Sequence, residues 1–226
     1  QFSTFVDGLL HARYPQIGSC SRLKFPLTSD RVCLKVLNAP WMITWFAQHT
    51  DAHILPLVRH PGAQAISVLR QNWGFAVEAY GHKIEQIAHH FSETQRSAIG
   101  EILNGTDKWA IAILDYAVLT RIFFTHFRSK IIRYEDIVID PIQFVDDVLV
   151  SQFGLTDREA MLKSLSRPSH SSRMSLKSLN DAIETGNSHA ILNMWRRKVT
   201  PEMQRTGQNI LDVFEIDTYN FYDEEV

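Results

Sequence analysis

Arg59 and Ser67 belong to a stretch whose residue types and spacing suit the binding of an anion such as a phosphate group. Arg59 follows the apolar run HILPLV, and Ser67 comes eight residues later, beyond His60 and Pro61. The apolar run predicts a short buried strand, and the residues after Pro61 predict a helix. Ligands of open α/β sheets gather at the carboxyl ends of the strands, where a guanidinium and a hydroxyl would suit a phosphate.

Short apolar runs alternate with amphipathic segments along the chain, and these predict the elements that must position Arg59 and Ser67. Strands are predicted at 32–37 (VCLKVL), 53–58 (HILPLV) and 130–134 (KIIRY). Helices are predicted at 4–12, 41–49, from about 62, within 75–103, at 108–127, from 141, and at 201–214. This alternation predicts an α/β fold, a central parallel sheet with helices on both faces. The Ser-rich segment 166–190 predicts a surface loop.

Length and composition predict one globular domain that spans residues 1–226. The net charge of −2 gives no global reason to expect a nucleic-acid partner. Cys20 and Cys33 form neither a metal-ligand spacing nor a disulfide framework and are interpreted as buried thiols. Since no apolar run reaches the ~18 residues of a membrane span, none is predicted. The oligomeric state is left open.

Three histidines in the predicted helical region 75–103 raise the question of a metal site. His82 and His89 are seven residues apart and share a helical face, and His90 follows directly. A third ligand at a suitable spacing and a carboxylate pattern are both missing. These histidines are therefore interpreted as a polar helix face, and no metal is expected.

The stretch around Arg59 resembles the sulfotransferase family that uses 3'-phosphoadenosine 5'-phosphosulfate. In that family a strand ends in Arg-x-Pro, a serine follows eight residues after the arginine, and these two residues hold the 3'-phosphate. Arg59, Pro61 and Ser67 match by type and spacing. Lys35, near the end of the preceding predicted strand, matches a lysine that the family places beside the sulfuryl group. The resemblance makes Lys35 the candidate catalytic residue.

A second match lies in IIRYEDIVIDP, residues 131–141. The family carries a strand that ends in Tyr-Glu-Asp, followed by a proline that opens a helix and then a Phe-Gly-Leu-like stretch. The resemblance places Tyr134 against the adenine. Glu135 and Asp136 are interpreted as structural residues, because carboxylates near strand ends often cap backbone groups or pair with arginine.

Two further matches concern the ends of the chain. Family members often carry a tryptophan and basic residues before the last helix, and this resemblance places Arg196 and Arg197 near the 3'-phosphate. The Arg-Lys-Gly triplet of many members is absent, so a solvated basic stretch is the alternative. Ser3 and Thr4 match part of the 5'-phosphosulfate loop, whose glycine and basic residue are absent. In this register the first strand and part of the loop would precede Gln1.

The resemblance implies a P-loop-type α/β fold and a sulfotransferase that transfers a sulfuryl group to a hydroxyl or amine acceptor. The acceptor would be a small molecule or a glycan, and the cytoplasm is slightly favoured over the Golgi lumen. The catalytic base is not identified: Leu37 replaces a histidine of cytosolic members, and Asp30, Asp7 and His11 are the candidates. The alternatives are a sulfotransferase-like nucleotide-binding or interaction protein without catalysis, and a different P-loop enzyme such as a small-molecule kinase.

Overall fold

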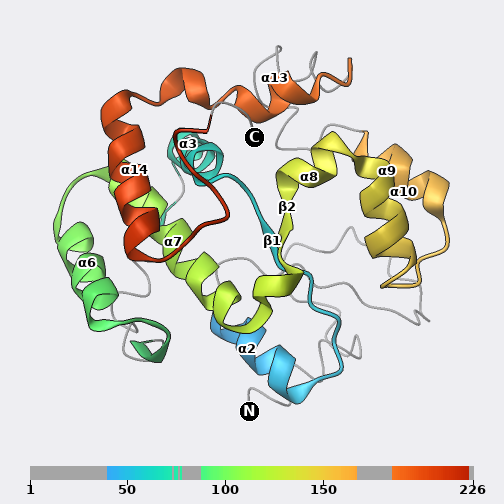
Figure 1. The fold of residues 1–226 in the computed structure, drawn as a ribbon, viewed down its shortest axis with the longest axis horizontal. Helices are drawn as coiled ribbons and strands as arrows, with labels where there is room; N and C mark the ends of the chain where they lie inside the picture. Colours follow the sequence, from blue (N-terminus) through green and yellow to red (C-terminus); the bar gives the residue numbers. More distant parts are fainter. Residues whose placement is uncertain (1–39, 73, 76, 78–87, 167–184, 224–226) are drawn as a thin grey trace. The chain divides into compact units, whose positions relative to one another are not determined.

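The computed structural model of this chain describes residues 40–72, 74, 75, 77, 88–166 and 185–223 (Figure 1). All of them belong to one compact unit. The strand predicted at 32–37, the helix predicted at 4–12 and the site residues Ser3, Thr4 and Lys35 lie outside the described residues. The expectation of a single domain over 1–226 stays a prediction.

The described residues contain one small parallel sheet, made of β1 (Leu57–Val58) and β2 (Ile132–Arg133). Leu57 lies opposite Ile132, and Val58 lies opposite Arg133. Both strands occur where apolar runs predicted them, but each is only two residues long. Pro56 explains part of the shortening of β1, because it has no N–H to donate, although its carbonyl accepts a hydrogen bond from the Ile132 amide. This part of the chain is therefore mostly helical.

The helices on either side of β1 begin and end for local reasons. α2 spans Pro40–His49, and α3 spans Pro61–Gln71. Pro61 suits the first position of α3, where a missing N–H costs nothing, and the His60 Nδ1 atom accepts a hydrogen bond from the Gly62 amide at 3.1 Å. α3 ends at Asn72, which adopts the left-handed conformation common at helix ends.

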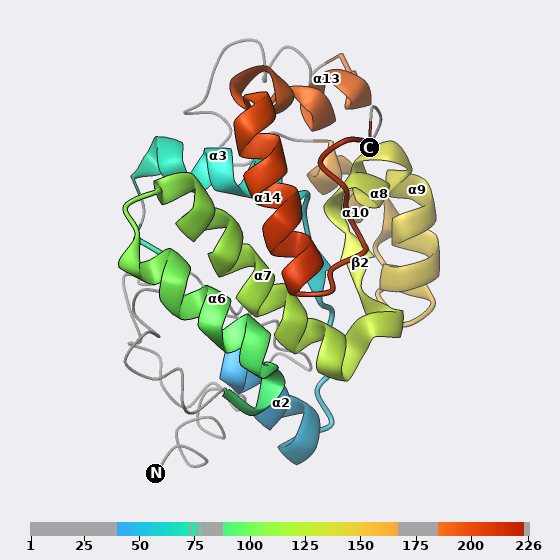
Figure 2. The same cartoon turned by 60° about the vertical axis from the view of Figure 1, so that its left-hand side comes forward.

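The core is built around α7 (Lys108–Phe127), which packs against α3, α14, α6 and α2 (Figure 2). Asp107 caps it, since its carboxylate accepts hydrogen bonds from the Trp109 and Ala110 amides. α7 is long and apolar enough to span a membrane, but 72% of the relevant window is buried inside the protein. A helix in the core of a globular protein is buried in the same way. α7 alone is therefore weak evidence for a membrane-spanning helix.

The chain between β2 and the last helix forms a series of short helices. These are α8 (Tyr134–Ile139), α9 (Pro141–Gln143), the π-helical turn η3 (Phe144–Val150), α10 (Arg158–Leu165), α13 (Ser188–Asn193) and η4 (Arg196–Lys198). Tyr134 thus begins a helix instead of ending a strand. The loop predicted for 166–190 is wrong at its end, because Asn187 caps α13 through the Ala190 amide. Residues 167–184 lie outside the described part.

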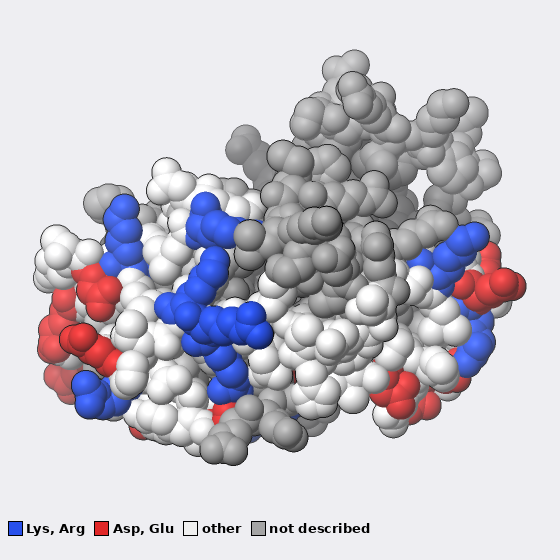
Figure 3. All heavy atoms as spheres, turned by 90° about the horizontal axis from the view of Figure 1, so that it is seen from above, with Lys and Arg blue, Asp and Glu red and all other residues white. Residues whose placement is uncertain are grey.

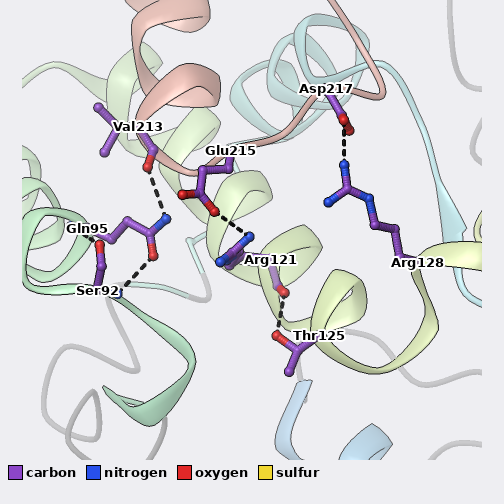
Figure 4. A network of polar contacts seen from close by, with 8 residues as sticks. All are labelled: Ser92, Gln95, Arg121, Thr125, Arg128, Val213, Glu215 and Asp217. Carbon is purple, nitrogen blue, oxygen red and sulfur yellow. Dashed lines mark hydrogen bonds and ion pairs between the residues drawn. The ribbon is translucent and has the colours of Figure 1, made fainter.

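The last helix, α14 (Pro201–Val213), is followed by a segment that returns along the core. Polar contacts hold the end of α14 and the first residues of this segment in place (Figure 4). α6 (Glu93–Asn104) contributes Gln95, whose Nε2 atom donates to the Val213 carbonyl at 3.0 Å. α7 contributes Arg121, which pairs with Glu215 at 2.9 Å. Two short turns complete this part of the chain: η1 (Ala88–His90) before α6 and η2 (Arg128–Lys130) after α7. Arg128 of η2 pairs with Asp217.

Candidate functional site

The carboxyl ends of β1 and β2 bring together residues that are far apart in the sequence. Arg59 follows β1 directly, and Tyr134 follows β2 directly. Because the two strands are parallel, these residues leave the sheet at the same edge. The guanidinium carbon of Arg59 lies 4.8 Å from the centre of the Tyr134 ring, within the range of a cation–π contact. The predicted position of Arg59 at a strand's carboxyl end is confirmed.

Glu135 and Asp136 have the structural roles that the sequence suggested. The Glu135 carboxylate is buried, and its Oε1 atom accepts a hydrogen bond from the backbone N–H of His60 at 2.9 Å. Its Oε2 atom accepts from the Tyr219 hydroxyl. The carboxylate of Asp136 pairs with Arg133 at 3.2 Å. Glu135 therefore ties the turn after β1 to the residues after β2.

An aromatic stack continues the group from His60 towards η4. The rings of His60 and Trp195 are stacked, with centroids 4.1 Å apart and an angle of 24° between their planes. The guanidinium carbon of Arg196 lies 4.9 Å from the centre of the Trp195 ring. Arg196 is fixed further by its Nε atom, which donates to Asn193 Oδ1 at 2.8 Å. Trp195 therefore brings Arg196 into the group that begins at Arg59.

We refer to these residues as the strand-end cluster. Its members are Arg59, His60, Arg133, Tyr134, Trp195 and Arg196.

The charges of three guanidinium groups act on one buried imidazole in this cluster. Burial, together with the charges of Arg196, Arg59 and Arg133, lowers the pKa of His60 to about 3. The backbone of Asn220 acts in the opposite direction, although within the described part of the chain the His60 Nε2 atom makes no hydrogen bond of normal geometry. His60 is thus neutral at pH 7 and leaves the positive charge of the cluster to its arginines.

Several donors of the strand-end cluster are buried and make no hydrogen bond within the described part of the chain. They are Arg59 Nε, Arg133 Nε, Arg196 Nη2 and Trp195 Nε1. An unsatisfied buried donor costs free energy, so native proteins contain few of them. Their concentration here is what a site for an anion with several acceptor oxygens requires. Burial also lowers the pKa of Arg196, partly offset by the charge of Asp223.

The structure unites only some of the predicted site residues. Arg59, Tyr134 and Arg196 lie in the strand-end cluster. Ser67 lies in the second turn of α3, where its hydroxyl accepts a hydrogen bond from Gln71 Nε2 at 3.1 Å, and its described contacts do not reach Arg59. Arg197 is exposed, and no described contact joins it to the cluster. The alternative interpretation, a solvated basic residue, fits Arg197 better than Arg196.

Sequence reasoning missed Arg133, His60 and Tyr219 as members or supports of the site. A signal existed for Arg133, since it is a charged residue inside a short apolar run. His60 stood between two motif residues, but nothing in the sequence marked it as buried. Tyr219 lies 84 residues beyond Glu135, and no local pattern could have joined the two.

Basic side chains gather on one face of the protein. Figure 3 shows this group of Lys and Arg side chains on the face that is seen from above relative to Figure 1. Among the described residues, no group of three or more His, Cys, Asp or Glu side chains is arranged to hold a metal ion. The guanidinium groups of the strand-end cluster have the chemistry to bind a negatively charged ligand.

Comparisons with known proteins identify no relative of this chain. It matches no family model, no curated protein and no solved structure. The strand-end cluster is therefore the observation on which a function can be proposed.

Proposed function

We propose that this chain binds 3'-phosphoadenosine 5'-phosphosulfate and transfers its sulfuryl group to a hydroxyl or amine acceptor. One observation carries the proposal. Arg59, at the carboxyl end of β1, holds its guanidinium against Tyr134 at the end of β2, and its buried Nε makes no hydrogen bond with the described residues. This position and these residue types support the resemblance to the sulfotransferases that use this nucleotide.

The 3'-phosphate would be held by Arg59 and Arg196. A guanidinium offers two parallel N–H donors to a phosphate, and partial burial strengthens such charge-assisted hydrogen bonds. Arg59 and Arg196 are both partly buried and neither forms an ion pair within hydrogen-bond distance in the described residues. Arg133 would contribute less, because Asp136 already pairs with it.

The adenine would lie beside Tyr134. The Tyr134 ring is partly exposed and already contacts one planar cation, the Arg59 guanidinium. Aromatic rings and guanidinium planes are common stacking partners for nucleobases. A nucleotide bound here would thus place its base and its 3'-phosphate against neighbouring residues of one sheet edge.

In the reaction, an acceptor oxygen or nitrogen would attack the sulfur in line with the bond to the 5'-phosphate oxygen. The sulfur–oxygen bond to the nucleotide breaks, 3'-phosphoadenosine 5'-phosphate leaves, and the acceptor loses its proton to a base. Charge spreads onto the leaving oxygens, which a positive group stabilises. Lys35 would supply that charge, and no metal is needed in this scheme.

Nucleotide binding without transfer is the second candidate function. Leu37 favours it, because this residue stands where cytosolic members of the family carry a catalytic histidine. Both functions require the same nucleotide site, so binding is the property to test first.

Calorimetric titration with 3'-phosphoadenosine 5'-phosphate tests the proposal. We expect micromolar binding by the wild-type chain and at least about tenfold weaker binding by Arg59→Ala, since a lost charged hydrogen bond costs ~1.5–3 kcal/mol. Arg70→Ala is the matched control, because Arg70 is exposed in the last turn of α3. No binding by the wild type, or equal losses in both variants, would overturn the proposal. Binding without sulfuryl transfer to any of a panel of phenols, amines and sugars would support the second function.

A further inference from the structure

Glu135 is a buried carboxylate beside a positively charged site, yet the hydrogen bonds that it accepts come from neutral donors. Only 2% of its surface is exposed. Its two oxygens accept hydrogen bonds from the His60 backbone N–H and from the Tyr219 hydroxyl. Arg59 directly precedes His60, and the guanidinium of Arg133 lies over the Tyr219 ring. Glu135 is therefore an anion close to guanidinium donors that the proposed ligand would need.

The hydrogen bond from His60 controls the backbone from which Arg59 projects. The His60 N–H belongs to the peptide group that joins Arg59 to His60. When Glu135 Oε1 accepts from it at 2.9 Å, the plane of that peptide is fixed relative to the end of β2. The next turn is fixed by the Gly62 N–H, which donates to His60 Nδ1. The direction in which Arg59 leaves β1 thus depends on the place of the Glu135 carboxylate.

Tyr219 holds that carboxylate from a third segment of the chain. Its side chain is buried, and its ring packs edge-on against His60 at a centroid distance of 5.2 Å. The guanidinium carbon of Arg133 lies 5.5 Å from the centre of the same ring. Burial and the charge of Glu135 raise the pKa of Tyr219, so its hydroxyl keeps its proton and remains a donor. The contacts Arg121–Glu215 and Arg128–Asp217 hold the segment that carries it.

We propose that Tyr219 is a positioning residue that keeps Glu135 away from the guanidinium groups of the strand-end cluster. Without the hydroxyl, one oxygen of the buried carboxylate loses its donor. Arg133, whose guanidinium carbon lies 5.5 Å from the centre of the Tyr219 ring, has a buried Nε that makes no hydrogen bond within the described residues. The carboxylate then pairs with a guanidinium and competes with the 3'-phosphate for it. This inference rests on the proposed function, because it concerns the availability of the same site.

Two nucleotides that differ only in the 3'-phosphate make the test specific. We expect wild-type protein to bind 3'-phosphoadenosine 5'-phosphate much more tightly than adenosine 5'-phosphate. In Tyr219→Phe the ratio of the two dissociation constants should fall at least about fivefold, since one phosphate contact is lost. Tyr222→Phe is the matched control, because Tyr222 is 54% exposed, and its ratio should stay at the wild-type value.

A double variant separates competition from simple loss of structure. In Tyr219→Phe/Glu135→Gln the neutral amide still accepts from the His60 N–H but no longer attracts a guanidinium. The ratio should therefore return to within about twofold of the wild-type value, a change of less than ~0.5 kcal/mol. An unchanged ratio in Tyr219→Phe, or a lowered ratio that Glu135→Gln does not restore, would overturn the inference.

The His60 amide gives a readout that does not depend on a nucleotide. In Tyr219→Phe its hydrogen exchange, followed by NMR, should become faster because the carboxylate has left it. If the wild type binds neither nucleotide, the proposed function fails. The exchange rate of the His60 amide still shows whether the Glu135 carboxylate moves away from it in Tyr219→Phe. An unchanged exchange rate of the His60 amide would contradict the inference in that case.

Discussion

At the scale of single residues, the most informative group is His60, an imidazole buried among three arginines. The folded protein binds its proton poorly, with a pKa of about 3, whereas an unfolded chain binds it with a pKa of ~6.5. Protonation therefore favours unfolding. The stability that neutral His60 contributes is complete above about pH 6.5 and is lost as the pH falls towards 3. The groups that face it are Arg59, Arg133, Arg196, Glu135 and Tyr219.

This predicts a pH dependence of stability that His60→Asn removes. Asparagine keeps an oxygen that can accept from the Gly62 N–H, as His60 Nδ1 does, but it does not titrate. Between about pH 7 and 5 the wild type should lose up to ~1.4 kcal/mol per pH unit through this residue. His90, whose pKa burial lowers to about 4, contributes in both proteins.

Urea unfolding at several pH values measures the effect. The free energy of unfolding of His60→Asn should fall less steeply than that of the wild type over this range. Parallel curves for the two proteins would mean that His60 is not buried in its neutral form.

The sequence predicted single residues better than their contacts. Arg59 and Tyr134 could each be named, because each follows an apolar run and matches a motif by type. Their mutual contact could not be named, since 75 residues separate them and the pairing of β1 with β2 creates it. Tyr219 had no motif and follows no apolar run. Its role depends on the path of the chain after α14.

At the scale of elements, α14 packs closely against the segment that returns after it. Gly207 of α14 is buried, and an added Cβ would lie 2.5 Å from Phe221 Cε2 and 2.6 Å from Phe221 Cζ. Phe221 is fully buried and also contacts His60 and Trp195 edge-on. A displacement of Phe221 would therefore reach the strand-end cluster.

Gly207→Ala should destabilise the protein by roughly 1–3 kcal/mol, the usual cost of overpacking a core. Gly100→Ala is the control, because Gly100 lies inside α6 with no atom within 4 Å of the added Cβ. Alanine there should stabilise the protein by up to about 1 kcal/mol through helix propensity. Chemical denaturation of both variants measures their free energies of unfolding, which should change in opposite directions. A stabilised Gly207→Ala would show that α14 and Phe221 do not pack as described.

Element prediction succeeded where the local signals agreed. α7 spans Lys108–Phe127 as expected, because Asp107 supplies a cap and the following apolar residues are unbroken by Gly or Pro. It failed where composition overruled a local signal. The polar segment before Ser188 indicated a loop, although Asn187 is a good cap for α13. Strand length was overestimated, because a six-residue apolar run at 53–58 gives only two ladder residues beside Pro56.

At the scale of the whole molecule, a chain of net charge −2 concentrates cations at one edge of its sheet. The three arginines of the strand-end cluster come from three segments: the end of β1, the end of β2, and η4. Partial burial weakens screening by salt, so their attraction for an anion is stronger than that of scattered surface charges. A built site of this kind should recognise where a phosphate lies on its ligand, and not only its charge.

The most direct test of this account is a comparison of two isomers in calorimetric titrations of the wild-type chain. Adenosine 3',5'-bisphosphate and adenosine 2',5'-bisphosphate carry the same charge and the same base. If the strand-end cluster holds the 3'-phosphate, the 3',5' isomer should bind at least about tenfold more tightly, a difference of ~1.4 kcal/mol. Equal affinities, or binding of neither isomer, would contradict a nucleotide site at the strand-end cluster.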